Sequence, residues 1–439
     1  MMHRPLLLAV CASALTLAAC GSGPVAPEGS TYGAKPTLVE PHRNLLSPTV
    51  NIAPAVGWPA GAMPVAPQGF RVQTFASGLD HPRWLYRLPN GDILVAETNA
   101  PPNPLKKTEG IRGWVMGLVM KRAGAAPASP NRIILLRDAD GDGVAETKST
   151  FLENLTSPFG MALVGNRLFV ANADAVVAFP YQSGQTQITA PATKIADLPA
   201  GRNHHWTKSL VASADGTKLY VGVGSNSNIG ENGMDEEEGR AAIHEIDIAT
   251  GVQRVFASGL RNPVGMDWQP DSASLWVAVN ERDELGNDLV PDYMTSVRDG
   301  GFYGWPWSYY GQTVDARVKP QDPARVASAL APDYALGAHT ASLGLTFYEG
   351  TAFPAAYSHG AFVGQHGSWN REPKSGYKVI FVPFSNGAPS GGPQDFLTGF
   401  LNDESEAMGR PVGVEVDRLG ALLVADDVGN VIWRVAPAT

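Results

Sequence analysis

Six short apolar segments recur along the chain, and each follows a turn of small or polar residues. A run of this length, bounded by turn residues, is typical of a buried β-strand. The shared pattern at irregular intervals also indicates an internal repeat. The six segments are 92–97, 167–172, 218–223, 274–279, 360–365 and 421–426.

A second short strand is predicted before each of these segments, and four of the six open with a Pro motif. Pro can begin a strand because its missing N–H costs no ladder hydrogen bond at that position. The small residue two positions later would let neighbouring strands crowd together near an axis. The four motifs are 81–84, 157–160, 262–265 and 410–413, and the stretches 205–208 and 340–344 replace them in the third and fifth copies.

A constant strand–turn–strand unit with loops of unequal length predicts an all-β fold, a six-bladed β-propeller with four-stranded antiparallel blades. A pair of β-sandwiches is the alternative, but it would not repeat one motif six times. The composition agrees, because 48 Gly and 35 Pro favour many short strands over long helices. A hydrophobic share of 44% excludes disorder over most of the chain.

The N-terminus is predicted to direct export. A short basic start is followed by an apolar run from Leu6 to Ala19, which is too short to span a bilayer. Residues 17–21 resemble a bacterial lipobox, in which Cys20 would be lipidated; an ordinary signal peptide is the alternative. We therefore expect a lipoprotein signal at 1–19, a flexible Pro/Gly-rich tether at 20–66 and the propeller at 67–439. The protein would be anchored to a bacterial membrane by its lipid alone, facing the periplasm.

The residues just before each inner strand would converge on one mouth of a propeller. Three of these six positions bring His (His81, His205 and His339) and two bring Arg (Arg261 and Arg410). This concentration predicts a polar, cationic pocket suited to an anionic ligand. The net charge of −9 argues against a general nucleic-acid binder, so the basic groups are expected in the pocket rather than on the exterior.

The chain resembles the soluble pyrroloquinoline quinone (PQQ) sugar dehydrogenases, most closely the sorbosone dehydrogenase branch. The likeness extends over about residues 67–436, and its motifs are specific in combination rather than singly. The segments that carry it are 203–208, 223–228, 259–266, 280–286, 300–306 and 364–371.

The resemblance implies that PQQ accepts a hydride from a sugar carbon bearing a hydroxyl, while Ca²⁺ bound to the quinone polarises the receiving carbonyl. His205 matches the catalytic base, and a neutral imidazole suits this role because its pKa lies near the working pH. Arg261 would act near the reactive carbonyls. Structural roles are the alternatives for His205, Arg261, His339 and Trp369. The implied cofactor-binding residues are Arg261, Asn262, Arg371, Lys374, Trp369, Arg410 and His339.

Two loops are candidates for metal binding. By resemblance, the quinone-bound Ca²⁺ would lie in the acidic loop 280–288, with Glu281, Arg282 and Asp288 as candidate ligands. The sugar dehydrogenases have Gly-Pro where this chain has Glu281-Arg282, so the ligand set stays open. Separately, Asp138, Asp140 and Asp142 alternate before a Gly, which matches the start of a Ca²⁺ loop without completing an EF-hand. A polar turn is the alternative.

Taken together, these features favour a PQQ-dependent dehydrogenase acting on an aldose or a sorbosone-type sugar, with a quinone or cytochrome as electron acceptor. A metal-dependent lactonase or similar hydrolase on a six-bladed propeller is one alternative, but its axis would carry mainly Glu, Asn and Asp. A non-catalytic binding propeller is the other. The sugar dehydrogenases carry Gly-Asp where this chain has Gly224-Ser225, and this difference leaves the substrate undetermined.

Overall fold

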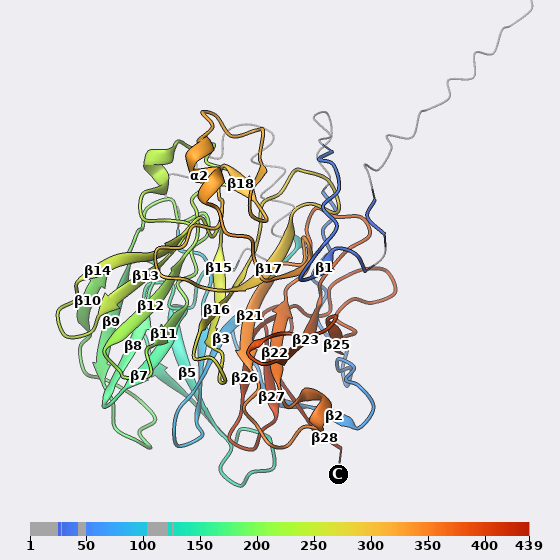
Figure 1. Cartoon of the computed structure of the whole chain (residues 1–439). Coiled ribbons are helices and arrows are strands. Elements are labelled where there is room, and N and C mark those ends of the chain that lie inside the picture. Colours follow the sequence, from blue (N-terminus) through green and yellow to red (C-terminus); the bar gives the residue numbers. More distant parts are fainter. Residues whose placement is uncertain (1–24, 28, 43–49, 103–121, 125–126, 439) are drawn as a thin grey trace, which may run out of the picture.

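The computed structural model describes residues 25–27, 29–42, 50–102, 122–124 and 127–438. The described chain is nearly all β, and its six main sheets stand around one axis as the blades of a propeller (Figure 1). The predicted six-bladed β-propeller is confirmed. Within the described residues, no helix has the length and apolar character needed to cross a bilayer.

Blades 1 to 3 each contain four antiparallel strands that follow one another in the sequence. From the axis outward they are β3 (Pro82–Arg87), β4 (Ile93–Glu97), β5 (Arg132–Arg137) and β6 (Thr147–Leu152) in blade 1; β7 (Met161–Val164), β8 (Arg167–Ala171), β9 (Ala175–Pro180) and β10 (Thr193–Asp197) in blade 2; and β11 (Leu210–Ala212), β12 (Lys218–Val223), β13 (Ala242–Asp247) and β14 (Gln253–Ser258) in blade 3.

Blades 4 to 6 keep this order and add short elements. Blade 4 contains β15 (Pro263–Trp268), β16 (Leu275–Val279), β17 (Pro291–Ser296), β20 (Tyr334–Ala338) and, outermost, β1 (Tyr32–Gly33). Blade 5 contains β21 (Ser342–Phe347), β22 (Gly360–Gln365), β23 (Lys378–Ser385) and β25 (Gln394–Leu397), with β24 (Ala388–Pro389) beside β23. Blade 6 contains β26 (Pro411–Val416), β27 (Leu422–Asp426), β28 (Val431–Pro437) and β2 (Phe70–Ser77). Outside the blades lie β18 (Ser308–Tyr309), β19 (Thr313–Val314), α2 (Pro323–Ser328) and the 3₁₀ turns η1 (Met234–Glu237) and η2 (Ala355–Tyr357).

The ring is closed by strands from the two ends of the propeller sequence. β2 pairs antiparallel with β28, from Phe70 opposite Pro437 to Ser77 opposite Val431. Figure 1 shows the two strands side by side at the end of the propeller that carries the C-terminus. Opening the ring would therefore break the hydrogen bonds between β2 and β28, and these bonds stabilise the closed form.

The glycines of the inner strands confirm the predicted crowding around the axis. A Cβ atom added to Gly160, Gly265, Gly344 or Gly413 would come within 3.0 Å of backbone atoms in the inner strand of the next blade. No side chain fits at such a distance, so these four glycines are required by the approach of neighbouring blades rather than by a turn.

Six buried apolar side chains, one from each blade, meet near the axis in a single cluster. They belong to the starts of the inner strands or to the residues just before them, and two of their contacts are Trp84–Phe159 at 4.7 Å and Phe159–Trp206 at 5.7 Å between ring centroids. This plug lies between the residues of the mouth and those of the opposite end of the axis. The six residues are Trp84, Phe159, Trp206, Val264, Leu343 and Val412.

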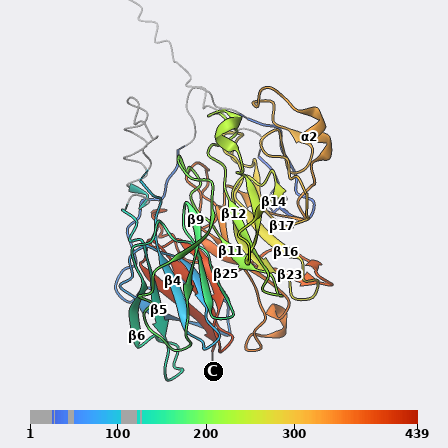
Figure 2. The same ribbon diagram turned by 90° about the vertical axis from the view of Figure 1, so that its left-hand side faces the viewer.

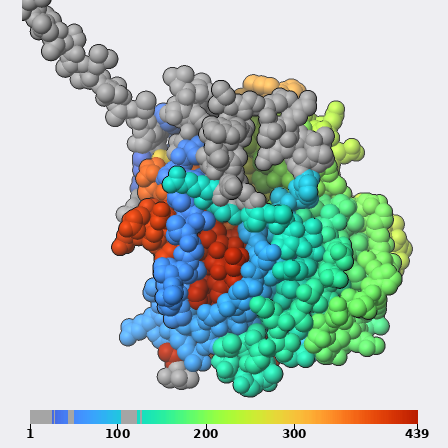
Figure 3. All heavy atoms as spheres, turned by 180° about the vertical axis from the view of Figure 1, so that it is seen from behind, coloured from blue at the N-terminus to red at the C-terminus, as the bar shows by residue number. Residues whose placement is uncertain are grey.

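The described part of the segment 20–66, which the sequence predicts to be a tether, makes several contacts with the propeller. β1 adds to the outer edge of blade 4, and Trp58 donates its indole N–H to Asp426 at 2.6 Å. Val65 exchanges backbone hydrogen bonds with Thr398. Figure 3 shows the blue N-terminal part of the chain lying over the red C-terminal part. An extended segment can pair with blade edges without a regular hydrophobic pattern, so its Pro and Gly content alone does not indicate these contacts.

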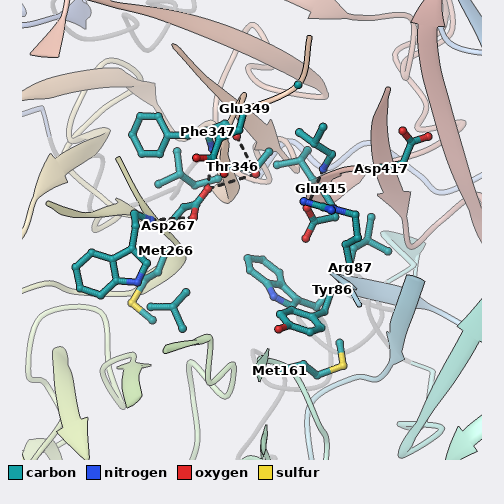
Figure 4. Close-up of a pocket in the computed structure, with 18 of the residues that line it drawn as sticks. Tyr86, Arg87, Met161, Met266, Asp267, Thr346, Phe347, Glu349, Glu415 and Asp417 are labelled. Carbon is teal, nitrogen blue, oxygen red and sulfur yellow. Dashed lines mark hydrogen bonds between the residues drawn. The ribbon is translucent and has the colours of Figure 1, made fainter. Parts of the chain in front are cut away.

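A cavity of about 570 Å³ opens at the end of the axis opposite the mouth, and all six inner strands contribute to its wall (Figure 4). Two of its carboxyls accept hydrogen bonds from backbone N–H groups: Asp267 from Phe347 of the next blade at 2.8 Å, and Glu415 from Val416 at 2.9 Å. Burial raises the pKa of Asp267 to about 6. Burial, together with the charge of Asp267, raises the pKa of Glu415 to about 7.

We expect Glu415→Gln to stabilise the protein at pH 8 but not at pH 5. A raised carboxyl pKa means that the folded state disfavours the ionised form. Ionisation of Glu415 therefore lowers the free energy of unfolding, an effect that is absent below the unfolded pKa and complete above pH 7. A pKa rise from 4.5 to about 7 corresponds to a loss of at most roughly 3 kcal/mol, and water in the cavity makes this loss smaller. Thermal unfolding at both pH values measures the effect. Glu349→Gln, an exposed carboxyl of the same cavity, is the control. An equal change in Tm at both pH values would contradict the prediction.

Candidate functional site

The mouth of the propeller collects the loops that precede the inner strands and those that follow the second strands of the blades. The structure places His205, Arg261, Asn262, His339 and Arg410 at this end, as the sequence predicted. Nearly all are buried or half-buried. The mouth therefore concentrates groups that can titrate or carry charge in a region of low solvent access.

His205 is held in the form that a general base requires. Its Nδ1 lies 2.9 Å from the carbonyl oxygen of Ser225 and 3.0 Å from the Ser225 hydroxyl. A carbonyl oxygen can only accept, so Nδ1 carries the proton and Nε2 presents its lone pair. Burial, followed by the charges of Arg261 and His204, holds the pKa of His205 well below its usual value. The imidazole is therefore neutral at pH 7 and able to accept a proton.

Gly224 makes room for two of the predicted site residues. A Cβ atom at Gly224 would lie 2.5 Å from Asn262 Oδ1 and 2.5 Å from the Cβ atom of His205. The buried Asn262 Oδ1 has no hydrogen-bond partner in the described structure. Gly224 thus lets His205 and Asn262 approach each other, and it leaves an unpaired acceptor in the site.

Arg261 organises the loops on the same side of the mouth. Its guanidinium donates to Glu281 O at 2.6 Å and to Asn228 Oδ1 at 3.0 Å, and it lies 3.5 Å from the Asp283 carboxylate. Only 2% of the side chain is exposed. Most of its donors are therefore engaged within the protein, and Arg261 fixes the loop after β16 as well as carrying charge.

His339 lies in the site as a fully bonded residue. Its Nδ1 is 3.3 Å from Asp283 Oδ1, and its Nε2 is 2.9 Å from Gly286 O. Burial opposes protonation, but the hydrogen bond and charge of Asp283 outweigh it, and the pKa of His339 is raised. With both ring nitrogens engaged, His339 positions Asp283 and has no free donor for a ligand.

Blades 1, 5 and 6 contribute a second cluster that the sequence analysis did not assign. Asp427 accepts from Arg83 Nη1 at 2.6 Å and from His366 Nε2 at 3.0 Å, and His81 Nε2 lies 3.7 Å away. Burial lowers the pKa of His366 to about 4 despite the nearby carboxylate. The sequence held one signal for the cluster, because Asp427 directly follows a repeat strand and Arg83 sits inside a Pro motif.

Arg410 is a buried cation with no carboxylate partner among the described residues. Its guanidinium donates to the carbonyls of Ala53 at 3.2 Å and His366 at 3.4 Å, and it lies 4.9 Å from the centre of the Tyr377 ring. Its Nε atom is buried and unpaired. Only 4% of the residue is exposed. An uncompensated buried charge of this kind is costly, so an anionic ligand at this position would be strongly favoured.

Two other residues that were predicted to bind the anionic cofactor, Arg371 and Lys374, already have partners within the protein. Arg371 donates to Asp288 at 2.7 Å and to backbone carbonyls of its own and a neighbouring loop. Lys374 donates to Asn51 of the N-terminal segment at 2.8 Å. Trp369 is half-buried, and its carbonyl accepts from Asn51. The polar groups of these residues are already engaged within the protein. Their contacts hold the rim loops together and attach the N-terminal segment at Asn51 to the rim.

The predicted metal residues separate into two groups. The side chains of Glu281, Arg282 and Asp288 form ion pairs with Arg282, Asp315 and Arg371, respectively. Glu281 Oε1 is buried without a hydrogen-bond partner in the described structure, so a cation in this loop would have that oxygen in addition to backbone carbonyls. Asp138, Asp140 and Asp142 do come together, and the structure adds Glu146. Their ligand oxygens all lie within 4.8 Å of one another. The lipidation prediction at Cys20 falls outside the described residues.

Comparison with curated proteins gives three relatives of modest identity. The chain is 28% identical over 297 residues to an uncharacterized protein of Borreliella burgdorferi, covering 65% of this chain and 77% of that protein. It is 25% identical to a pyrroloquinoline quinone-dependent pyranose dehydrogenase of Coprinopsis cinerea, over 77% of this chain but only 47% of that protein. It is 23% identical to a pyrroloquinoline quinone-dependent sugar dehydrogenase of Hypocrea jecorina, over 83% and 87%.

Solved structures share the fold at low identity. The holo form of the PQQ domain of the Coprinopsis cinerea pyranose dehydrogenase aligns with a TM-score of 0.69 at 20% identity, covering 88% of this chain and all of that one. The PQQ-bound aldose sugar dehydrogenase of Streptomyces coelicolor aligns with a TM-score of 0.55 at 16% identity, covering 85% and 99%. These alignments confirm the propeller fold, whereas the sorbosone branch stays a prediction.

A family model extends over most of the propeller. It is described as TrAA12-like, and it matches residues 131–295 and 312–438, which include every inner strand except β3. The matched regions contain His205, Arg261, Asn262 and Arg410. The chain therefore belongs to the TrAA12-like family.

Proposed function

We propose that the protein is a PQQ-dependent oxidoreductase that oxidises a hydroxyl-bearing carbon of a sugar, with His205 as general base. The observation that carries this proposal is the state of His205: it is neutral, Ser225 fixes it through Nδ1, and Nε2 has no hydrogen-bond partner within the part of the chain that the structure describes. The curated relatives named as PQQ-dependent dehydrogenases of sugars support it.

The residues of the mouth fit an anionic cofactor. PQQ carries three carboxylates, and Arg410 offers an unpaired buried Nε with no carboxylate partner among the described residues. Arg83 also has an unpaired buried Nε, and Asn262 has an unpaired buried Oδ1. PQQ, when bound, supplies the hydride acceptor of the reaction. Arg410 and Arg83 would hold its carboxylates through charge-assisted hydrogen bonds, and Asn262 would orient it.

The chain's own residues then account for the proton. Oxidation of an alcohol releases the hydroxyl proton, and His205 Nε2 would accept it within hydrogen-bond reach. The Ser225 carbonyl stabilises the resulting imidazolium, because it already accepts from Nδ1. Arg261 keeps the loop after β16 in place through Asn228 and Glu281. Trp369 would border the cofactor from the rim.

The calcium proposals are separate from the proton transfer. We propose that a Ca²⁺ ion would lie next to the cofactor and that carbonyls of the loop 280–288 would hold it.

The cluster of Asp138, Asp140, Asp142 and Glu146 is proposed as a second calcium site. We expect 1 mM Ca²⁺ to raise Tm and Asp140→Asn to abolish that rise. Differential scanning fluorimetry with EDTA as the reference measures both. A calcium-dependent rise that is equal in the variant would contradict the assignment.

The finer substrate and location are also proposals. We propose an aldose or a sorbosone-type sugar as substrate, a quinone or cytochrome as electron acceptor, and attachment to a bacterial membrane through a lipid on Cys20, with the protein facing the periplasm. The net charge of −9 and the basic mouth are compatible with a small neutral substrate entering a cationic pocket.

One experiment tests the proposed function directly. Full-length protein carrying Cys20→Ser, to avoid lipidation, is mixed with PQQ and CaCl₂, and dye reduction is followed with a panel of aldoses and sorbosone. Binding of PQQ at micromolar concentration and sugar-dependent reduction are the expected results. Absence of PQQ binding would overturn the proposal. Binding without oxidation of any sugar would favour a binding propeller.

A further inference from the structure

The N-terminal segment is attached to the rim of the mouth at its first described residues. The backbone N–H of Ala26 donates to the Asp288 carboxylate at 3.0 Å, and Ala26 is buried at this contact, with 8% of the residue exposed. Asp288 belongs to the loop after β16, whose Asp283 also pairs with Arg261 of the site. The chain therefore meets the propeller at the rim of the mouth and not at the opposite end.

The residues that follow stay at the same end of the propeller. The backbone N–H of His42 donates to Leu285 O at 2.9 Å, again in the loop after β16. Farther along, the carbonyl of Ala53 accepts from Arg410 of the site at 3.2 Å. In Figure 1 the dark blue residues of this segment lie in the upper half, whereas the C-terminus lies at the lower end. The N-terminal segment therefore runs along the rim before it reaches β2.

The length of chain between the proposed lipid and this contact is short. Cys20, the residue proposed to carry the lipid, precedes Ala26 by six positions. A fully extended chain spans at most about 3.6 Å per residue, so the two α-carbons can be no more than ~22 Å apart in any conformation. A lipidated Cys20 would be held at the bilayer surface. The rim at Asp288 would therefore be held within about this distance of the bilayer.

The height of the propeller prevents its opposite end from lying on the membrane at the same time. An inner strand such as β15 has six residues, which at about 3.3 Å each span ~20 Å. The loops of the mouth and the turns at the other end add to this height. If the end that carries the C-terminus met the bilayer, the rim would lie farther from the surface than the chain before Ala26 can reach. The mouth is therefore the nearer end.

Exposed apolar side chains on the rim agree with this orientation. Val25, Val50 and Val56 are 70%, 43% and 51% exposed. Backbone or side-chain hydrogen bonds of Ala26, Asn51 and Val56 to the propeller fix all three side chains at this surface. Apolar side chains next to a lipid anchor gain free energy when they enter the bilayer interface. The opposite end also has exposed apolar side chains, so the reach of the chain decides the orientation.

From these distances we infer that the mouth of the propeller faces a lipid surface, with the lipid on Cys20 holding the rim towards the bilayer and the C-terminal end pointing away. The inference rests on the lipid attachment proposed above. A substrate would then reach His205 from the space between the rim and the bilayer rather than from open solvent.

Energy transfer from labelled protein to a fluorescent lipid in vesicles measures this orientation. The chain has two Cys, Cys11 in the predicted signal and Cys20, so a Cys introduced into the lipidated protein would be its only free thiol. Exposed positions are available at both ends of the propeller, and Figure 2 shows α2 at the end opposite the C-terminus. The three variants are Ala327→Cys on α2 and Asp174→Cys after β8, both at the mouth, and Gln182→Cys after β9, at the other end.

We expect the two labels at the mouth to transfer energy efficiently. Because the strands between the two ends span ~20 Å, transfer from Gln182→Cys should be at most about half as efficient. The matched control inserts about 30 Gly and Ser residues between Gly23 and Pro24, which gives a flexible chain with a mean reach of ~30 Å. This insertion should bring the three efficiencies closer together, because either end can then approach the bilayer.

The possible outcomes separate the orientation from the proposals on which it rests. Equal transfer from all three labels without the insertion, or strongest transfer from Gln182→Cys, would overturn the orientation and leave the lipid attachment intact. Strong transfer from Ala327→Cys alone would mean that the propeller lies on the side of blade 4, which also overturns it. A mass spectrum with unmodified Cys20 would overturn the attachment and the orientation together. Dye reduction by soluble Cys20→Ser protein tests the proposed oxidation independently of both.

Discussion

The His205→Ala variant is expected to lose at least ~100-fold in kcat while binding PQQ with unchanged affinity. In the proposed mechanism the imidazole accepts the substrate proton, and its Nε2 has no hydrogen-bond partner among the described residues. Ser225 holds Nδ1, at 2.9 Å from its carbonyl and 3.0 Å from its hydroxyl. Removing the imidazole therefore removes the base without removing Arg410 or Arg83, the groups expected to bind the cofactor.

The pH dependence provides a second readout of the same role. Protonated His205 cannot accept a proton, so kcat/KM should fall as the pH falls through its pKa. Burial and the charge of Arg261 hold this pKa well below its usual value of 6.5, and the acid limb should therefore lie below the pH at which an ordinary histidine titrates. The measurement is kcat/KM of the wild type from pH 4.5 to 8, together with the residual rate of His205→Ala, which should show no such limb.

His359→Ala is the matched control for this prediction. His359 is exposed, and it lies in the loop between β21 and β22 at the opposite end of the propeller. It should retain wild-type kcat. Wild-type turnover in His205→Ala, or a proportional loss of PQQ binding in that variant, would contradict the assignment of His205 as base.

Much of the fold could be predicted from the sequence because the propeller repeats a local pattern. The glycines of the Pro motifs illustrate this, since a small residue two positions after Pro already indicated close packing, and Cβ atoms added to Gly160 and Gly413 would meet the backbone of the next blade. The closing strand β2 and the docked N-terminal segment were not predicted. Their partners lie more than 300 residues away in the sequence, and no local period connects such positions.

The structure brings several of the predicted site residues together at one mouth, whereas their roles stay predictions. His205, Arg261 and Asn262 follow directly from motif matches, and the structure places all three at the mouth. Arg371 and Arg410 could not be distinguished by sequence, because both are Arg residues in loops of neighbouring blades. Their difference depends on Asp288, which is 83 residues from Arg371 and supplies a counter-charge to that residue alone. Ion pairing at such separation is a property of the packed structure.

Because Arg410 has no carboxylate partner among the described residues and Arg371 has one, replacing Arg410 is expected to have the second large effect. Arg410→Met should weaken PQQ binding roughly 10- to 100-fold, because it removes charge-assisted hydrogen bonds to a carboxylate. The apoprotein should be as stable as the wild type or more stable, since the variant removes a buried charge that has no carboxylate partner among the described residues. The Met side chain keeps the apolar stem that packs beside Tyr377. Calorimetry with PQQ and thermal unfolding without it measure the two effects.

Arg371→Met is the matched comparison, and it should behave in the opposite way. Its loss leaves the buried Asp288 without its counter-ion, which should destabilise the apoprotein by about 2–3 kcal/mol. Affinity for PQQ should change little, because the guanidinium is already engaged. If Arg371→Met instead abolishes PQQ binding while Arg410→Met leaves it intact, the cofactor is held at the rim and the buried cation at Arg410 has another role. The paired variants thus decide where the anionic groups of the cofactor lie, from stability and affinity together, before any activity is measured.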